Sequence, residues 1–169
     1  MCKSLYLLIA SGFLALTAHA DELPPLRSSV TLAETSPSFV TRAVDGVQAT
    51  LDEALELLGI RYKRGGSTPA SGFDCSGFVR HVFNESVGLL LPHNAKAISQ
   101  HGEKVEKTDL KPGDLVFFNT MKRAFSHVGI YLGDNRFVHA PKPGAKVRIE
   151  NLGDSYWTRR YNGARRVQP

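Results

Sequence analysis

Cysteine is nearly absent from this chain, whose only two cysteines, Cys2 and Cys75, lie far apart in the sequence. Two cysteines are too few for the disulfide framework of a small secreted domain, and they do not form the C-x-x-C pairs typical of zinc sites. Cys2 also precedes the first apolar segment, whereas the cysteine of a lipoprotein follows it. Cys75 is therefore either a buried apolar side chain or a reactive thiol.

Apolar runs long enough to cross a membrane are also missing. The longest, residues 5–16, is shorter than the roughly 20 apolar residues that a spanning helix needs. Lys3 precedes it and the small-x-small pattern of residues 18–20 follows it, as in a secretory signal peptide. We expect a signal peptide over residues 1–20, export to the periplasm or cell envelope, and no integral membrane span after cleavage. A retained membrane anchor is the alternative.

The chain has no basic stripe interleaved with aromatic residues, and such a stripe is typical of nucleic-acid binding. Its net charge of +5 is either solvated surface or a weak attraction to an anionic polymer. We therefore expect no nucleic-acid partner. The sequence has 169 residues, 42% of them hydrophobic, with no repeat or coiled-coil pattern, which indicates one globular domain. We expect the protein to be a monomer.

Residues 21–44 contain prolines and scattered Ser and Thr without periodicity, which predicts a flexible linker before a domain over residues 45–169. Apolar residues of segment 51–58 recur at helical spacing, and Gly59 is a plausible end. A second helix is predicted to begin at Asp74 or Cys75, with Asp74 as N-cap and Gly88 at its end.

A third, shorter helix is expected within residues 92–101, and the pattern after Pro112 changes to that of strands. The expected strands cover residues 115–119, 127–132, 136–140, 147–150 and 164–167. Helices followed by antiparallel strands predict an α+β domain in which N-terminal helices pack on an antiparallel sheet of about five strands.

The place of Cys75 favours the reactive reading. At a helix start, unpaired backbone N–H groups and the positive end of the helix dipole favour a thiolate and lower the thiol pKa. The same N–H groups can hold the oxyanion of a tetrahedral intermediate. Gly72 and Gly77 would leave room for a substrate.

A thiol hydrolase also needs a base, and His127 and His139 lie on two adjacent predicted strands. Side chains alternate along a strand, so these histidines share a face only if the connection has an odd number of residues or a bulge. With a loop over residues 133–135, Leu132 faces Arg136 and His139 lies opposite Gly129, diagonal to His127. We predict His127 as the base and His139 as the residue that orients it.

Three alternatives remain open for these residues. Both histidines can be structural, or their two roles can be exchanged. Cys75, His127 and His139 can also bind catalytic zinc, although the chain lacks the close ligand spacings typical of metal sites, and we expect no metal.

Five segments in this order resemble the NlpC-type cell-wall cysteine peptidases, across residues 48–167. They are Tyr62-x-x-Gly65-Gly66, residues 73–78 around Cys75, residues 110–118, residues 126–131 around His127, and residues 137–140 around His139.

The resemblance implies a papain-like α+β fold with Cys75 as nucleophile, His127 as base and His139 as third member. It also implies that the Tyr62 hydroxyl lies near the oxyanion, and it associates Asp74 and Ser76 with a free peptide amine, beside their role in helix capping. Many relatives carry an aromatic residue in place of Arg64.

The activity so implied is an exported cysteine endopeptidase, a thiol protease that hydrolyses amide bonds in peptidoglycan stem peptides or cross-links without a cofactor. An amidase or acyltransferase with the same thiol, and a non-catalytic wall-binding domain, are the alternatives.

Overall fold

The first described helix begins earlier than the sequence pattern indicates. The computed structural model of the protein describes residues 37–120 and 123–168, which lie within one compact unit, Thr35–Pro169. Helix α1 runs over Pro37–Glu56, so residues 37–44, expected to be linker, are helical. Proline is compatible with the first helical turn, where its missing N–H has no partner to lose. The predicted signal peptide, residues 1–20, and residues 21–36 lie outside the described residues.

The second helix begins and ends where its capping residues predict. Helix α2 covers Cys75–Val87; the Asp74 side chain accepts a hydrogen bond from the Gly77 N–H, and Gly88 closes the helix in the left-handed conformation. The expected third helix is present but short, as α3 over Ala95–Ile98. A further short helix, α4 over Ser155–Thr158, precedes the last strand.

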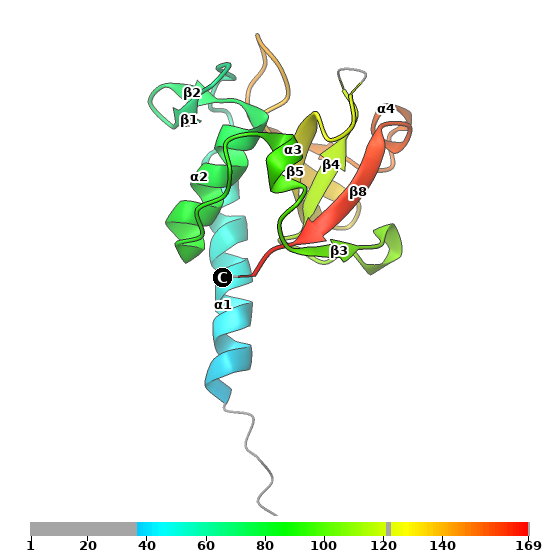
Figure 1. Ribbon diagram of the computed structural model, residues 1–169. Coiled ribbons are helices and arrows are strands. Elements are labelled where there is room, and N and C mark those ends of the chain that lie inside the picture. The colour runs from blue at the N-terminus through cyan, green and yellow to red at the C-terminus, as the bar shows by residue number, and fades with distance from the viewer. Residues whose placement is uncertain (1–36, 121–122, 169) are drawn as a thin grey trace, which may run out of the picture. The chain divides into compact units, whose positions relative to one another are not determined.

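The main sheet of the described residues has six antiparallel strands, where about five were expected, in the order β3-β8-β4-β5-β6-β7 (Figure 1). The additional strand is β3, which is only three residues long and pairs with β8. The bounds are Glu103–Val105 for β3, Leu115–Phe118 for β4, His127–Gly133 for β5, Arg136–His139 for β6, Arg148–Asn151 for β7 and Tyr161–Arg166 for β8.

The two faces of the sheet bury different clusters. Leu115 and Phe117 of β4 join the core beneath α1, α2 and α3, whereas Val116 and Phe118 point to the opposite face and pack with Trp157 of α4. Figure 1 shows the first three helices gathered on one side of the sheet and α4 beyond β8. The strict alternation along β4 therefore separates a helix-covered face from an α4 face.

The β5–β6 hairpin obtains its register from a bulge. Asp134 and Asn135 both have positive φ and form a two-residue turn closed by the pair Gly133 and Arg136. The pairing Leu132–Arg136, expected for a three-residue loop, is therefore wrong. A bulge between Tyr131 and Gly133 shifts the register by one residue, so that Ile130 lies opposite Val138. This shift places His127 and His139 on the same face, as predicted.

A second, two-stranded sheet lies directly before α2. Its strands are β1 over Ser67–Thr68 and β2 over Gly72–Phe73, and a short 3-10 helix over Lys107–Asp109 follows β3.

Among residues 37–120 and 123–168, no helix combines the length and apolarity that crossing a membrane requires.

Candidate active site

A cleft of about 650 Å³ brings together residues from both halves of the chain. Tyr62 and Cys75 line it from the helical half, and His127 lines it from the start of β5. Its other described lining residues are Arg64, Thr120, Ser126, Pro141, Lys142, Pro143, Arg148, Glu150, Asp154, Tyr156 and Trp157. Three of the six residues singled out from the sequence thus face one shared space.

The Cys75 side chain occupies the first position of α2, as predicted. Backbone N–H groups of Val128, Ser76 and Cys75 itself are directed at its sulfur and favour the thiolate. Burial and the neighbouring Asp74 carboxylate act more strongly in the opposite direction, and raise the pKa of the thiol from 9.0 to about 11. The expectation of a lowered pKa is therefore wrong, because desolvation outweighs the helix terminus.

The two histidine rings lie on the same face of the sheet and are in direct contact. His127 Nε2 and His139 Nδ1 are 2.7 Å apart, hydrogen-bonded, with the ring planes nearly perpendicular. A Cβ at Gly129 would lie 3.2 Å from the His139 Cβ, so the glycine leaves space beside the rings. The predicted common face of His127 and His139 is confirmed, and it depends on the β5 bulge.

The two histidines differ in their access to the cleft. His139 is completely buried and lies behind His127, whose ring reaches the cleft. Burial, and then the proximity of His139, lower the pKa of His127 well below 6.5. Burial likewise lowers the pKa of His139, against the opposing effect of the Glu150 carboxylate. Both rings are therefore neutral at neutral pH.

Trp157 supports both rings, and nothing in the sequence pattern pointed to it. Its indole stacks on His127 at a centroid distance of 5.7 Å and meets His139 edge-on at 5.0 Å. Only 6% of its surface is exposed. Packing on two sides fixes the ring orientations that a His127–His139 hydrogen bond needs.

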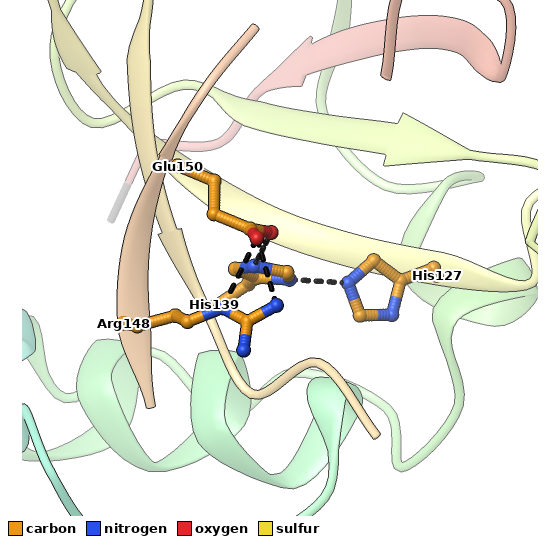
Figure 2. Close-up of polar contacts among 4 residues, drawn as sticks. All are labelled: His127, His139, Arg148 and Glu150. Carbon is orange, nitrogen blue, oxygen red and sulfur yellow. Dashed lines mark hydrogen bonds and ion pairs between the residues drawn. The ribbon is translucent and has the colours of Figure 1, made fainter. Parts of the chain in front are cut away.

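Glu150 and Arg148 extend this line of contacts, and the sequence analysis also missed them. His139 Nε2 lies 2.7 Å from Glu150 Oε2, and the Arg148 guanidinium donates to Glu150 Oε1 from Nε and Nη2. Figure 2 shows the four side chains in one connected series. In the β6–β7 register, His139 pairs with Arg148, so the side chains of Arg148 and Glu150 lie on the same face as His139. Once this register is known, the alternation of side chains along β7 predicts the contact.

Tyr62 is half-buried and lines the cleft beside Cys75. Burial, followed by the nearby Cys75 and Asp74, raises the pKa of its hydroxyl. The hydroxyl is therefore a protonated hydrogen-bond donor at neutral pH.

Asp74 and Ser76 are engaged elsewhere and are not among the described residues that line the cleft. Asp74 Oδ1 accepts from the Gly77 N–H and the Ser76 hydroxyl, and Oδ2 accepts from the Gly65 N–H. Both carboxylate oxygens thus hold the start of α2 and the loop before it. Ser76 is buried.

Gly77 does not leave the open space that we expected. A Cβ there would lie 2.0 Å from the Gly66 carbonyl oxygen, so the loop packs directly on α2. A Cβ on Gly72 would meet the Arg61 carbonyl oxygen at 2.6 Å, and its positive φ also requires glycine. These glycines allow backbone segments, and not a substrate, to approach closely.

In the described part of the chain, no group of three or more His, Cys, Asp or Glu side chains is arranged to hold a metal ion. Both ring nitrogens of His139 already contact protein partners. The zinc interpretation therefore finds no ligand set among these residues.

Comparison with known proteins identifies the same region of the chain. The sequence profile of the NlpC/P60 family matches residues 59–166. The Murein DD-endopeptidase MepS/Murein LD-carboxypeptidase of Escherichia coli strain K12 is 40% identical over 140 residues, which cover 83% of this chain and 73% of that protein. Gamma-DL-glutamyl hydrolase of Bacillus subtilis strain 168 is 45% identical over 117 residues, or 69% of this chain.

Our chain spans only 28% of the length of that hydrolase. Among solved structures, an NlpC/P60 family protein from Bacillus cereus ATCC 10987 superimposes with a TM-score of 0.67 at 34% identity, over 73% of this chain and 40% of that one. The profile match, the sequence identities and the common fold agree. The chain belongs to the NlpC/P60 family.

Proposed function

We propose that this protein is an exported cysteine endopeptidase that hydrolyses amide bonds in peptidoglycan stem peptides or their cross-links. The observation that carries the proposal is the common cleft of Cys75 and His127, with His127 hydrogen-bonded from behind to His139. A nucleophile, a base and a residue that orients the base are the parts that thiol-dependent acyl transfer requires.

The neutral thiol and neutral imidazole define the first step. Cys75 Sγ attacks the amide carbonyl carbon while His127 takes the thiol proton, so the charged pair exists only during attack. The N–H groups at the start of α2, with the Tyr62 hydroxyl, stabilise the oxyanion. His127 then donates its proton to the leaving amine. Water next attacks the acyl carbon and gives a proton to His127, the bond to Cys75 Sγ breaks, and His127 returns this proton to the sulfur.

The charges around the cleft favour an acidic peptide. Arg64, Lys142 and Arg148 line it, against the carboxylates of Glu150 and Asp154. Arg148 and Glu150 neutralise one another at 2.7 Å. The remaining surplus of positive charge would attract a substrate with a free carboxylate.

The names of two relatives support a cell-wall peptide as substrate, but they differ in the peptide bond that is cleaved. The Escherichia coli relative is named as a murein endopeptidase and carboxypeptidase, and the Bacillus subtilis relative as a gamma-glutamyl hydrolase. We propose the periplasm or cell envelope as the location and a monomer as the working form, with residues 1–20 as the export signal.

The test is mass spectrometry of the fragments released when the purified full chain digests a defined cell wall. An endopeptidase releases fragments cut within the stem peptide or its cross-link. An intact stem peptide separated from the sugar would instead indicate an amidase, and transfer of the acyl group to an added amine an acyltransferase. A binding-only domain would retain the wall without releasing fragments.

A further inference from the structure

A carboxylate–arginine pair lies directly behind the two histidines, on the edge strand β7. Glu150 Oε2 contacts His139 Nε2 at 2.7 Å, and Glu150 Oε1 accepts from Arg148 Nε at 3.1 Å and from Nη2 at 2.7 Å. Each carboxylate oxygen therefore has its own partner, and the side chain is held in one orientation. Figure 2 shows His139 between this pair and His127.

We propose that Glu150, held by Arg148, fixes the tautomers of His139 and His127 and thereby selects Nδ1 of His127 as the nitrogen that accepts the Cys75 proton. This inference rests on the proposed function. It makes Glu150 a positioning residue, because Glu150 acts on His127 through its contact with His139, although its side chain also lines the cleft.

The argument starts from the carboxylate, which can only accept hydrogen bonds. The hydrogen bonds with His139 and Arg148 outweigh the opposing effect of partial burial and lower the pKa of Glu150 below 4.5, so it is ionised at neutral pH. The proton between Glu150 and His139 must then belong to His139 Nε2. A neutral His139 has its other nitrogen, Nδ1, unprotonated and able only to accept.

The tautomer of His139 in turn determines the tautomer of His127. His139 Nδ1 accepts at 2.7 Å, so His127 Nε2 must carry the proton and donate it. Neutral His127 then has a lone pair at Nδ1, the one ring nitrogen that the contact with His139 does not occupy. One fixed negative charge on β7 thus determines which nitrogen of a ring on β5 acts as the base.

Among the described residues, Glu150 is the one anionic group that contacts the His139 ring. Phe137 of β6 and Trp157 of α4 pack against the ring. His139 itself is completely buried. In this setting the tautomer follows the carboxylate, because no exposed solvent competes for the ring nitrogens.

The direct test is two-bond ¹H–¹⁵N NMR of the histidine rings in the full chain, which distinguishes the two neutral tautomers. In the wild-type protein we expect His127 and His139 both to be protonated at Nε2. A wild-type His127 protonated at Nδ1 would overturn the proposal whatever any variant does.

Glu150→Gln supplies the second arm, because glutamine keeps the shape but can either donate to or accept from His139. We expect His139 to lose its single tautomer, and kcat on a defined wall peptide to fall about tenfold or more, whereas a charge that only attracts the substrate would change KM and leave kcat unchanged. Glu150→Asp, which keeps the charge, should recover part of kcat. Unchanged ring spectra and unchanged kcat in Glu150→Gln would contradict the proposal.

Glu53→Gln is the matched control. Glu53 Oε1 lies 3.6 Å from Nε2 of His81, a histidine outside the cleft, so the same substitution removes a carboxylate beside a different ring. Ring signals of His127 and kcat should be unchanged in this variant. The wild-type tautomers are measured without substrate, so a failed tautomer assignment and a failed peptidase assignment give different results.

Discussion

At the scale of single residues, the electrostatics of Cys75 determine how the proposed reaction would begin. Three backbone N–H groups favour a thiolate, but burial and the Asp74 carboxylate prevail and keep the thiol protonated. His127 is likewise neutral because it is buried. The protein therefore holds a neutral pair at rest, and in the proposed mechanism the proton moves only when a substrate is attacked.

Alkylation by iodoacetamide tests this resting state, because only the thiolate reacts rapidly. The alkylation rate of Cys75 should keep rising as the pH increases from 6 to above 9. A rate that reaches a plateau below pH 7 would contradict the account, since it would reveal a thiolate–imidazolium pair already formed.

Asp74→Asn tests the part of this effect that comes from the neighbouring charge. Asparagine remains a good N-cap but removes the negative charge, so the pKa of Cys75 should fall and alkylation at pH 7 should be faster than in wild type. Asp154→Asn is the control, because Asp154 lines the cleft but does not act on Cys75. Equal rates in the two variants would exclude the role assigned to Asp74.

The sequence predicts the residues of the site unevenly. Cys75, His127 and His139 stand in recognisable segments, but the common face of the two rings also depends on the β5 bulge, which parity allows without specifying. Glu150 was missed because its place depends on the β6–β7 register, which residues 140–147 conceal. Trp157 was missed because its helix, α4, has only four residues and no periodicity.

At the scale of elements, close contact between α2 and the preceding loop positions Cys75. Gly77 lies two residues after Cys75, and its missing side chain is replaced by the Gly66 carbonyl. The Asp74 cap and the Gly65 N–H add hydrogen bonds at the same place. Cys75 therefore stands on a helix terminus that is fixed from two sides.

Gly77→Ala should lower the free energy of unfolding by about 2–3 kcal/mol, because backbone must move to admit the methyl group. Hydrolysis should fall as well, since that movement displaces Cys75. Gly46→Ala is the matched control in α1, where the new Cβ would lie 3.4 Å from Val87 Cγ1. Its gain in helix propensity, about 0.5–1 kcal/mol, should leave it neutral or slightly stabilised in urea denaturation.

An ion pair between a buried aspartate and a partly exposed arginine joins β8 to the segment before β4. The Arg166 guanidinium donates to both carboxylate oxygens of Asp114, at 2.8 and 2.7 Å, and Asp114 is 1% exposed. The Lys111 N–H donates to the same carboxylate. This arrangement ties the last strand to the turn that leads into the centre of the sheet.

Arg166→Ala should therefore cost about 3 kcal/mol of unfolding free energy, because it leaves a buried carboxylate without its cation. Arg136→Ala removes an exposed arginine whose pair with Asp134 spans 3.4 Å. That control should change stability by less than about 0.5 kcal/mol. Similar losses in both variants would show that the Asp114 pair has no special place in the fold.

The sequence predicts elements well where a cap or an alternation marks them. Helix α2 begins and ends at its capping residues for this reason. The start of α1 was missed because Pro37 was interpreted as a linker residue. Strand β3 was missed because it is an edge strand of three residues, two of them charged and exposed.

At the scale of the whole molecule, the buried histidines make stability depend on pH. Unfolding exposes His127 and His139, whose pKa values then return to about 6.5. Below that pH the unfolded chain binds protons that the folded chain excludes, so the free energy of unfolding falls as the pH falls.

Denaturant unfolding between pH 7.5 and 5.5 measures this dependence. The loss below pH 6.5 should approach about 1.4 kcal/mol per pH unit for His127, and His139 should add a contribution of the same sign. His127→Gln should show a weaker dependence, whereas His93→Gln, which changes an exposed ring, should match wild type. Stability that is flat or rises toward pH 5.5 would contradict the buried neutral pair.

The complete site draws on both halves of the domain, since α2 provides the thiol, β5 and β6 the histidines, and β7 the carboxylate. The central claim is that this assembly cleaves wall peptides through Cys75. The most direct measurement is the rate at which folded Cys75→Ala releases peptide fragments from purified cell wall, beside wild type at equal concentration. We predict a loss of at least about a thousandfold with far-UV circular dichroism unchanged; release at the wild-type rate would contradict the account.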